Sequence, residues 1–550
     1  MNTNELPYFR VGCHEWHYLQ EEELKFIDKT ELIPDLVTGQ RLAFFAHPRR
    51  FGKTTLVDLL SELFAHGDGT FHGTAVFGRW PERVRYPVIK LNFLMFNCDS
   101  LQEAEQDLCI ELYYAFRGAL RAWDVWVPKE LQRTNFAEQC AVIEEYLGPR
   151  QVVFLIDEWD HPMTSHMLEP EKAAIAEAAL TQLYAWIARC PNTHFAFVTG
   201  ISSYHSAAIA PDFTNLSLDP HYATLVGLTP EELEQSLGDY IVEAARREPD
   251  HTPDDIRSEV KSEYLGFCFE ASGQVKLYNT WDIVNYFHYI GGDRDEWGVE
   301  RGCHWLDSSY AWVALKESLQ REPFDLGAIM RAYDDEVTLT PAELQAFMHD
   351  APWTLKTLFH QTGFYTIKGS NADGSYRLGF PNGEVSWCFN FVLREVIHGK
   401  DILHYSEHNP ARPLKRSAQK AFGQGDFTQF CALVNQLLRR TFFKYLQPQG
   451  LYRNLFAFWL RTESTAFHVH LGSDLNELDV TYQGQRYRIT IYEGEIGPLE
   501  WDAEPDCTHL ELQVDPALRQ IVSFTLLTAG QEPELQVVAP APEVKDLSEE

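Results

Sequence analysis

The stretch Leu42-Ala-Phe-Phe-Ala-His-Pro-Arg-Arg-Phe-Gly-Lys-Thr-Thr55 decides the fold of the first part of the chain. Its first five residues are an apolar run of strand length, and leucines follow it at helical spacing, at Leu56, Leu59, Leu60 and Leu63. A strand, a tight loop and a helix that begins at Gly-Lys-Thr are typical of a P-loop. In a P-loop, backbone N–H groups and the positive end of the helix surround nucleotide phosphates.

The loop residues have distinct expected roles. Lys53 is predicted to reach the β- and γ-phosphates, and the Thr54 hydroxyl is predicted to sit on Mg²⁺. The predicted nucleotide-binding set is Arg50, Phe51, Gly52, Lys53, Thr54 and Thr55. The usual pattern opens with Gly, whereas this chain has His47 at that position. Because an ordinary basic loop before a core helix would show the same letters, the strand and the helix around the loop carry the assignment.

A second stretch, Gln151-Val-Val-Phe-Leu-Ile-Asp-Glu-Trp-Asp160, is an apolar run followed by acids. Such a strand suits the middle of a parallel sheet, and acids at its carboxyl end lie where ligands bind in open α/β sheets. We predict that Asp157 holds Mg²⁺ through water. Glu158 is the predicted catalytic residue, which orients or deprotonates the attacking water. The alternative is a strand followed by a solvated acidic turn.

Two more strands are expected in the same sheet, at residues 86–93 and 193–200. The second of them ends in Thr199-Gly200. A polar side chain at that strand end would contact the γ-phosphate or the water, so Thr199 is the candidate sensor. Many buried strands end in Thr-Gly without any such role.

Several ordered segments resemble one family, the AAA-ATPase-like proteins that carry a C-terminal PD-(D/E)xK nuclease-like domain. They run through most of the chain: Phe26-Ile-Asp-Lys-Thr-Glu-Leu-Ile33, His47-Pro-Arg-Arg-Phe-Gly-Lys-Thr54, Leu155-Ile-Asp-Glu-Trp-Asp160, Leu218-Asp-Pro-His-Tyr-Ala-Thr-Leu-Val-Gly-Leu-Thr229, Leu277-Tyr-Asn-Thr-Trp-Asp-Ile-Val284 and Gly379-Phe-Pro-Asn-Gly-Glu-Val385. The family's loop also lacks the first Gly. The resemblance implies a bacterial protein with an α/β fold: an AAA-like parallel-sheet core, a helical middle domain and a restriction-endonuclease-like domain.

The expected domain boundaries combine this resemblance with local patterns. We predict an ATPase domain at 1–228, a mostly helical middle domain at 229–399, a nuclease-like α/β domain at 400–535 and a mobile acidic tail at 536–550. A capping box, Thr229-Pro-Glu-Glu232, starts the first helix of the middle domain.

Shorter elements are expected inside the second and third domains. Strand-like pieces at 362–368 and 376–380 read as a β-hairpin. Two helices, at 414–423 and 427–446, are predicted to precede a β region at 468–493.

The nuclease-like domain departs from the pattern that its resemblance implies. A working site uses an Asp on one strand and Glu-x-Lys on the next, where the carboxylates bind Mg²⁺ and the Lys positions or activates water. The candidate acids here are Glu463, Asp479, Glu493 and Glu495. The Glu-x-Lys position reads Tyr492-Glu493-Gly494, and no Lys occurs between Lys444 and Lys545. We therefore predict a degenerate, inactive site in a domain kept for binding or folding.

The amino-acid composition limits the partners that the protein is expected to bind. The net charge is −34, which disfavours non-specific binding to nucleic acid, because such binding comes mainly from Lys and Arg on phosphates. No apolar run is long enough for a membrane helix, and the start of the chain shows no secretory signal. The ten cysteines include no C-x-x-C pair, which suits a reducing cytosol. We expect a cytoplasmic protein with no membrane partner.

The sequence thus predicts a Mg²⁺-ATP-binding P-loop ATPase with slow turnover, acting as a nucleotide-gated switch. Its C-terminal domain is expected to contact a protein partner or a second copy, and binding of nucleic acid is left open. Two alternatives remain, an ATP-dependent metal nuclease and a nucleotide-binding scaffold without turnover. The absent Lys argues against the nuclease, and Glu158 beside Asp157 argues against the scaffold.

Overall fold

The computed structural model divides into two compact units by contact. The first comprises Met1–Ala311 with Val337–Ser386, and the second comprises Trp312–Glu336 with Trp387–Glu550. The structure describes residues 6–93, 96–166, 169–201, 209, 212–248, 251–288, 304–307, 316, 319–320, 323–331, 336–346, 354–398, 411–461, 467–472, 474–494, 506–528 and 533–538. The predicted domain boundaries at 228 and 399 stay predictions, and the predicted acidic tail lies largely outside the described residues.

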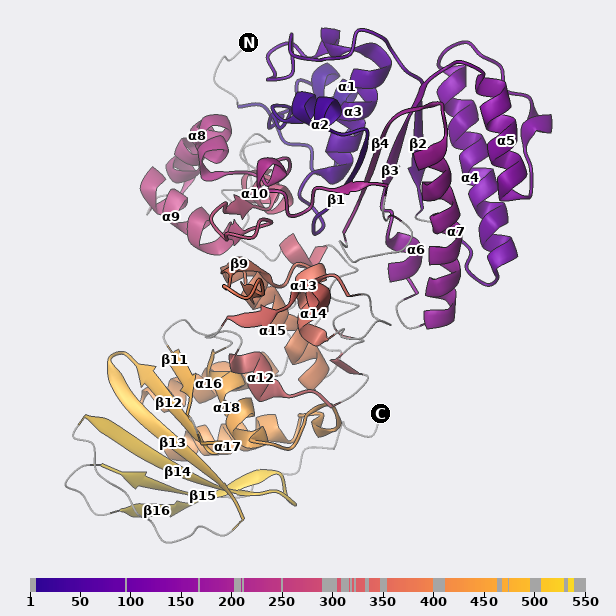
Figure 1. The fold of residues 1–550 in the computed structure, drawn as a ribbon. Helices are drawn as coiled ribbons and strands as arrows, with labels where there is room; N and C mark the ends of the chain where they lie inside the picture. The colour runs from indigo at the N-terminus through magenta and orange to yellow at the C-terminus, as the bar shows by residue number, and fades with distance from the viewer. Residues whose placement is uncertain are drawn as a thin grey trace. The chain divides into compact units, whose positions relative to one another are not determined.

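A five-stranded sheet with parallel pairings forms the core of the first unit (Figure 1). The strand order is β2-β3-β4-β1-β5, with bounds β1 Leu42–Ala46, β2 Val88–Asn92, β3 Val152–Asp157, β4 Thr193–Gly200 and β5 Thr214–Asn215. Every residue of β1 and β3 is buried, as expected for strands with neighbours on both sides and helices on both faces. The predicted α/β fold with a parallel-sheet core is confirmed for this unit.

Helices cover both faces of this sheet. The long helices α4 (Leu101–Arg121), α5 (Phe136–Leu147) and α7 (Pro170–Arg189) pack on the face that carries Phe44, Phe154 and Val198. On the other face, α3 (Lys53–His66) places the Phe64 ring 5.2 Å from the ring of Phe195. Because the strands are parallel, their carboxyl ends share one edge, where the register sets Asn92 beside Asp157.

The rest of the first unit is mainly helical. The predicted capping box is present: Thr229 accepts from the Glu232 N–H at the start of α8, and the Glu232 carboxylate accepts from the Thr229 N–H. The predicted hairpin is also present, and a third strand, β8, pairs with it. The bounds are α1 Trp16–Glu21, α2 Ile33–Gly39, α6 His161–Thr164, α8 Pro230–Arg247, α9 Pro253–Tyr264, β6 Leu265–Phe267, β7 Leu277–Tyr278, α10 Thr280–Phe287, β8 Val337–Leu339, α13 Pro341–Leu344, α14 Leu355–Gln361, β9 Thr366–Ser370 and β10 Tyr376–Gly379.

The second unit is a six-stranded sheet with helices packed on one face. The order is β11-β12-β13-β14-β15-β16, in which β13 and β14 are parallel and the other pairs antiparallel. The strands are β11 Phe467–Leu471, β12 Glu477–Tyr482, β13 Gln485–Glu493, β14 Cys507–Asp515, β15 Gln520–Leu527 and β16 Glu534–Val537. The helices are α12 Leu326–Arg331, α16 Ala411–Gly423, α17 Phe427–Leu438 and α18 Leu451–Arg461, and α15 (Gly383–His398) spans the boundary between the units.

One predicted helix is shorter in the structure. The pattern predicts a helix to residue 446, but α17 ends at Leu438. The backbone leaves the helix because the Phe442 N–H donates to the carbonyl of Ile397, 2.7 Å away, instead of to a residue of its own helix. The Thr441 hydroxyl donates a hydrogen bond to the carbonyl of Leu437 at 3.1 Å. Tertiary contact thus overrides the local helical pattern.

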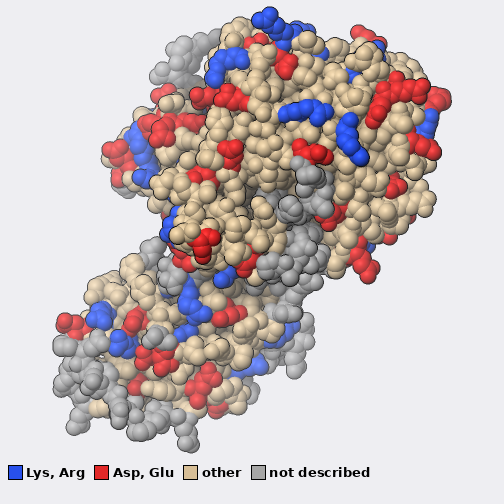
Figure 2. Space-filling view, in the orientation of Figure 1, with Lys and Arg blue, Asp and Glu red and all other residues tan. Residues whose placement is uncertain are grey.

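Acidic side chains gather over α4–α5 and over α8–α9 on the face shown in Figure 2. This distribution places much of the visible negative charge on outer helices. None of the described helices is long and apolar enough to cross a lipid bilayer.

Candidate functional site

The loop between β1 and α3 ends at a helix that has no side-chain cap. Gly52 precedes α3 with a φ of 100°, a left-handed conformation that glycine adopts without strain. Arg50 has a φ of 73°, which costs a residue with a side chain about 1–2 kcal/mol. The first N–H groups of α3 and the positive end of its dipole therefore form an anion-binding surface.

His47, which replaces the opening glycine, points into the core. Its side chain is 2% exposed, Nε2 lies 3.0 Å from the Ser217 carbonyl, and its ring stacks on Phe269 at 3.9 Å. Burial lowers the pKa of His47 to about 3, so the ring is neutral. The loop tolerates a side chain at this position because that side chain packs away from the cavity.

Lys53 lies at the start of α3 and is 6% exposed. Its Nζ donates to the Pro48 carbonyl at 2.8 Å, so the ammonium is folded along the loop. Burial lowers the pKa of Lys53, and the carboxylates of Glu158, Asp157 and Asp160 oppose that shift. The acids at the end of β3 thus stabilise a buried cation beside the loop.

Thr54 and Asp157 meet across the edge of the sheet. The Thr54 hydroxyl donates to Asp157 Oδ2 at 2.7 Å, and the N–H of Glu158 donates to Asp157 Oδ1 at 3.0 Å. Burial raises the pKa of Asp157, the nearby Glu158 raises it further, and the Thr54 hydrogen bond lowers it. A hydroxyl and a carboxylate are oxygen ligands of the kind that Mg²⁺ prefers.

Glu158 has two features of a functional carboxylate. It is held at a φ of 52°, a conformation that side-chain-bearing residues rarely adopt and that concentrates at active sites. Its Oε2 is buried and has no hydrogen-bond partner in the described part of the protein. An acceptor of this kind is available to a water molecule or a ligand.

Thr199 is the predicted site residue that the structure does not bring to this group. Its hydroxyl donates to the Phe45 carbonyl at 2.6 Å, and it does not line the cavity described below. Asp160, which the sequence left without a role, fastens the acidic turn to the end of β4. Its Oδ1 accepts from the Ile201 N–H at 3.2 Å, and the Trp159 N–H donates to the Thr199 carbonyl at 3.1 Å.

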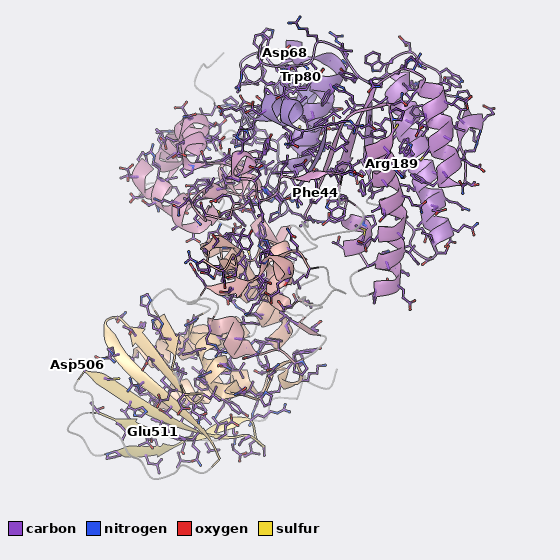
Figure 3. All side chains as sticks on the ribbon, viewed as in Figure 1. Phe44, Asp68, Trp80, Arg189, Asp506 and Glu511 are labelled. Carbon is purple, nitrogen blue, oxygen red and sulfur yellow. The ribbon has the colours of Figure 1, made fainter. Side chains whose placement is uncertain are left out.

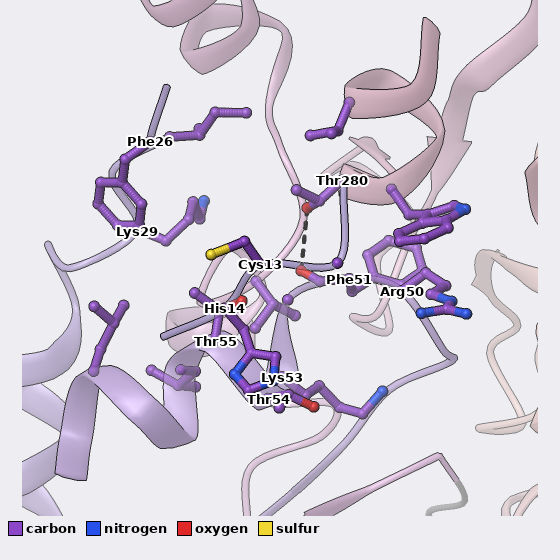
Figure 4. Close-up of a pocket in the computed structure, with 18 of the residues that line it drawn as sticks. Cys13, His14, Phe26, Lys29, Arg50, Phe51, Lys53, Thr54, Thr55 and Thr280 are labelled. Carbon is purple, nitrogen blue, oxygen red and sulfur yellow. Dashed lines mark hydrogen bonds between the residues drawn. The ribbon is translucent and has the colours of Figure 1, made fainter. Parts of the chain in front are cut away.

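These residues line one cavity of about 630 Å³, a volume typical of small-molecule sites (Figure 4). It is lined by every predicted nucleotide-binding and metal-binding residue together with the catalytic candidate: Arg50, Phe51, Gly52, Lys53, Thr54, Thr55, Asp157 and Glu158. The structure therefore brings together side chains that lie about a hundred residues apart in the sequence, as the parallel sheet predicts.

Part of the cavity wall was not anticipated. Residues of the N-terminal segment also line the cavity, among them His14, which lies beside Lys53 and Thr54 in Figure 4, and Phe26 and Lys29. His14 Nδ1 contacts the carboxylate of Asp58 on α3. The described cationic residues of the wall are Arg10, Lys25, Lys29, Arg49, Arg50 and Lys53. A chain with net charge −34 thus keeps a basic lining where phosphates would bind.

The two predicted acids of the second unit that the structure describes, Asp479 and Glu493, are not brought together. In the register, Asp479 on β12 faces Arg488 on β13, five positions before Glu493. Because side chains alternate between faces along a strand, Glu493 lies on the opposite face from Arg488 and Asp479. Glu463 and Glu495 lie outside the described residues.

The face that carries Asp479 is polar, and two pairs of its side chains are in contact. The Arg488 Nε lies 3.1 Å from Asp479 Oδ1, and the Thr490 hydroxyl lies 2.8 Å from His509 Nε2. Glu511 lies on this sheet too (Figure 3). Among the residues that the structure describes, no three His, Cys, Asp or Glu side chains are grouped to hold a metal ion.

Comparison with known proteins gives one similar protein along most of the chain. It is described as an uncharacterized protein in the vnfD 5′ region of Azotobacter chroococcum mcd 1, and it is 25% identical over 510 residues, covering 90% of this chain and 89% of its own. Among solved structures, the Aeropyrum pernix Orc1 protein in complex with DNA aligns with a TM-score of 0.26 and 12% identity, over 67% of this chain and 90% of its own. A TM-score this low does not indicate a shared fold. Residues 10–210, which hold the loop, the β3 acids and the N-terminal cavity wall, match the family model of the predicted AAA-ATPases.

Proposed function

We propose that this chain binds Mg²⁺-ATP in the cavity of its first unit and hydrolyses it slowly. The observation that carries the proposal is the 2.7 Å contact between Thr54 Oγ1 and Asp157 Oδ2 beside an uncapped helix N-terminus. The donor set fits Mg²⁺, which takes few ligands from protein and the others from phosphates and water. The match of residues 10–210 to predicted AAA-ATPases supports the same function.

Each side chain has a role in this proposal. Lys53 and the N–H groups of the loop bind the phosphates, while Thr54 and Asp157 hold Mg²⁺. Bound Mg²⁺ would neutralise charge on the phosphate oxygens. Glu158 orients the attacking water or accepts its proton, since its Oε2 is buried without a partner in the described structure. Turnover is slow because Thr199 is committed to the Phe45 carbonyl, so this β4 hydroxyl does not assist the water.

The nucleoside would occupy the apolar part of the cavity. The apolar side chains that line the cavity come from the N-terminal segment, from the residues before α8 and from α10: Phe9, Leu19, Phe26, Ile27, Leu225, Val226 and Val284. A planar base buries apolar area against such a wall.

The second unit is proposed to contact a protein partner or a second copy, with its availability set by the nucleotide. Its two described candidate acids, Asp479 and Glu493, lie on opposite faces of the sheet, which favours recognition over metal-dependent cleavage. The net charge of −34 favours a protein over loosely bound nucleic acid. We place the chain in the cytoplasm, because the described cysteines are free thiols.

Calorimetric titration with ATP and Mg²⁺ tests the binding. Lys53→Ala is expected to weaken ATP binding about a hundredfold or more, because it removes a charge-assisted phosphate contact worth on the order of 3 kcal/mol. Lys129→Ala, at an exposed lysine of the first unit, is the matched control and should bind like the wild type. Equal affinity in wild type and Lys53→Ala would contradict the P-loop assignment.

A further inference from the structure

The loop between β1 and α3 is hydrogen-bonded by the segment that starts α10, and Thr280 and Trp281 of that segment also line the cavity. Three successive carbonyls of the loop accept hydrogen bonds from this segment. Asn279 Nδ2 donates to Arg49 O at 3.2 Å, the Trp281 N–H donates to Arg50 O at 3.1 Å, and the Thr280 hydroxyl donates to Phe51 O at 3.1 Å. The contact between Thr280 and Phe51 is the dashed line in Figure 4. This segment lies about 230 residues after the loop in the sequence.

These contacts set the direction of the loop's N–H groups. In a trans peptide unit the C=O of one residue and the N–H of the next point in opposite directions. Holding the carbonyls of Arg49, Arg50 and Phe51 toward the start of α10 therefore turns the N–H groups of residues 50–52 away from α10. Residues 50–52 all line the cavity.

Asn279 performs two tasks with one amide. Its Oδ1 accepts from the Trp281 N–H at 2.9 Å and from the Asp282 N–H at 3.3 Å, which caps α10, while Nδ2 donates to the loop. The side chain is fully buried. Only a side chain with an acceptor and a donor on one rigid group can make both contacts, since Asp lacks the donor and Ser lacks the reach.

Further contacts hold the segment that starts α10 against the loop. The backbones of Leu228 and Tyr278 pair through two hydrogen bonds, of 3.1 and 2.8 Å, and the Gly227 N–H donates to Phe51 O at 3.0 Å. The Arg50 guanidinium lies 4.1 Å from the centre of the Trp281 ring. The loop is thus held at Arg49, Arg50 and Phe51.

We infer that Asn279 is a positioning residue for phosphate binding: it fixes a loop that lacks the opening glycine in the shape that presents its N–H groups to an anion. The inference rests on the proposed nucleotide binding. Fixing this shape before binding removes an ordering cost that the ligand would otherwise meet. Loss of the Asn279 donor should therefore weaken ATP binding without unfolding the unit.

The test is Asn279→Ser, which keeps a helix-capping oxygen and loses the donor to Arg49 O. Calorimetry should show about fivefold to tenfold weaker ATP binding, with Mg²⁺ and also with EDTA, while the melting temperature changes little. Asn135→Ser is the matched control, because Asn135 caps α5 by accepting from the Glu138 N–H. That variant should bind ATP like the wild type.

A second variant covers a failure of the first to fold. Thr280→Val is close to isosteric and removes the hydroxyl that donates to Phe51 O, so it should weaken ATP binding by a similar factor. Wild-type affinity in folded Asn279→Ser, or in Thr280→Val should Asn279→Ser not fold, would overturn the inference. Failure of the proposed function is distinguishable, because it would show as ATP binding that is absent in the wild type or insensitive to Lys53→Ala.

Discussion

The largest sheet of each unit places its described carboxylates differently. In the first unit, Asp157 ends a parallel strand and meets the hydroxyl of Thr54 at 2.7 Å. In the second, Asp479 and Glu493 lie on adjacent antiparallel strands but on opposite faces. A parallel sheet collects the carboxyl ends of its strands at one edge, whereas two antiparallel strands assemble a site only when the spacing of the residues has the right parity.

The two groups also differ in environment. Asp157 is 5% exposed and lies beside the buried cation of Lys53. The side chain of Asp479 is 46% exposed and paired with Arg488. Burial strengthens electrostatic interactions with a ligand, while an exposed ion pair is screened and self-satisfied. The comparison predicts strong functional effects in the first unit and weak ones in the second.

The largest effect is expected at Glu158. Glu158→Gln keeps the shape of the side chain and cannot accept a proton from water, so ATP turnover should fall about 10²–10⁴-fold. Binding of ATP should be retained. Phosphate release in single-turnover reactions measures this, with Glu145→Gln, at an exposed residue of α5, as the control. Wild-type turnover in Glu158→Gln would exclude Glu158 as the catalytic residue and favour a nucleotide-binding scaffold.

A smaller effect is expected from Asp157→Asn. The amide retains the shape but loses the charge, so the gain in ATP affinity on adding Mg²⁺ should shrink about 10–100-fold, while affinity in EDTA stays nearly constant. Titrations of ATP at several Mg²⁺ concentrations show the change. Asp254→Asn is the control, because that side chain is 91% exposed. Unchanged Mg²⁺ dependence in Asp157→Asn would remove Asp157 from the metal site.

Gly200→Ala tests how tightly the acidic turn is held against β4. A Cβ at this position would lie 2.3 Å from Asp160 Oδ1 and 2.4 Å from Trp159 Cδ1. Because something must shift, the free energy of unfolding should fall by about 1–3 kcal/mol, measured by denaturant titration. Gly118→Ala within α4 is the control, since its Cβ would meet nothing within 4 Å and alanine favours a helix. A Gly200→Ala protein as stable as the wild type would show that the turn adjusts freely.

The smallest effect is expected at Asp479. Asp479→Ala breaks one partly exposed ion pair with Arg488, which should cost at most about 1 kcal/mol in the free energy of unfolding. ATP turnover should be unchanged. Arg488→Ala, which breaks the same pair from its other side, should show a loss of the same size. A much larger loss in the free energy of unfolding of either variant would contradict the assignment of this pair as a weak, partly exposed ion pair.

The sequence predicts those parts of the site that are marked by a local pattern of residues. The apolar runs of β1 and β3, the Gly-Lys-Thr at the start of α3 and the two acids after β3 define the phosphate loop and its partners. The parallel sheet then follows from these runs, because an apolar strand needs cover on both faces.

Contacts that use backbone carbonyls leave no such signature. Asn279 supports the loop through the carbonyl of Arg49, which any residue type would offer, so no pattern around position 49 points to it. The resemblance marked the segment 277–284 without a role. The burial of His47 depends in the same way on Ser217 and Phe269, which lie far along the chain.

The predicted β region at 468–493 leaves out β14, although the sequence carries a signal for it. Polar His509 and Glu511 alternate with apolar Leu510 and Leu512, which is a strand pattern whether or not the polar side chains are exposed. The separation of Asp479 from Glu493 has no such signal, because it depends on the pairing register of β12 with β13.

The contrast between the two sheets is tested most directly in one reaction that contains the purified protein, Mg²⁺, ATP and labelled DNA or RNA. Released phosphate and the length of the nucleic acid are read from the same tube. The account predicts slow phosphate release that stops in Glu158→Gln, with nucleic acid left intact in every nucleotide state. Cleavage that disappears in Asp479→Ala, or an absence of phosphate release in the wild type, would contradict it.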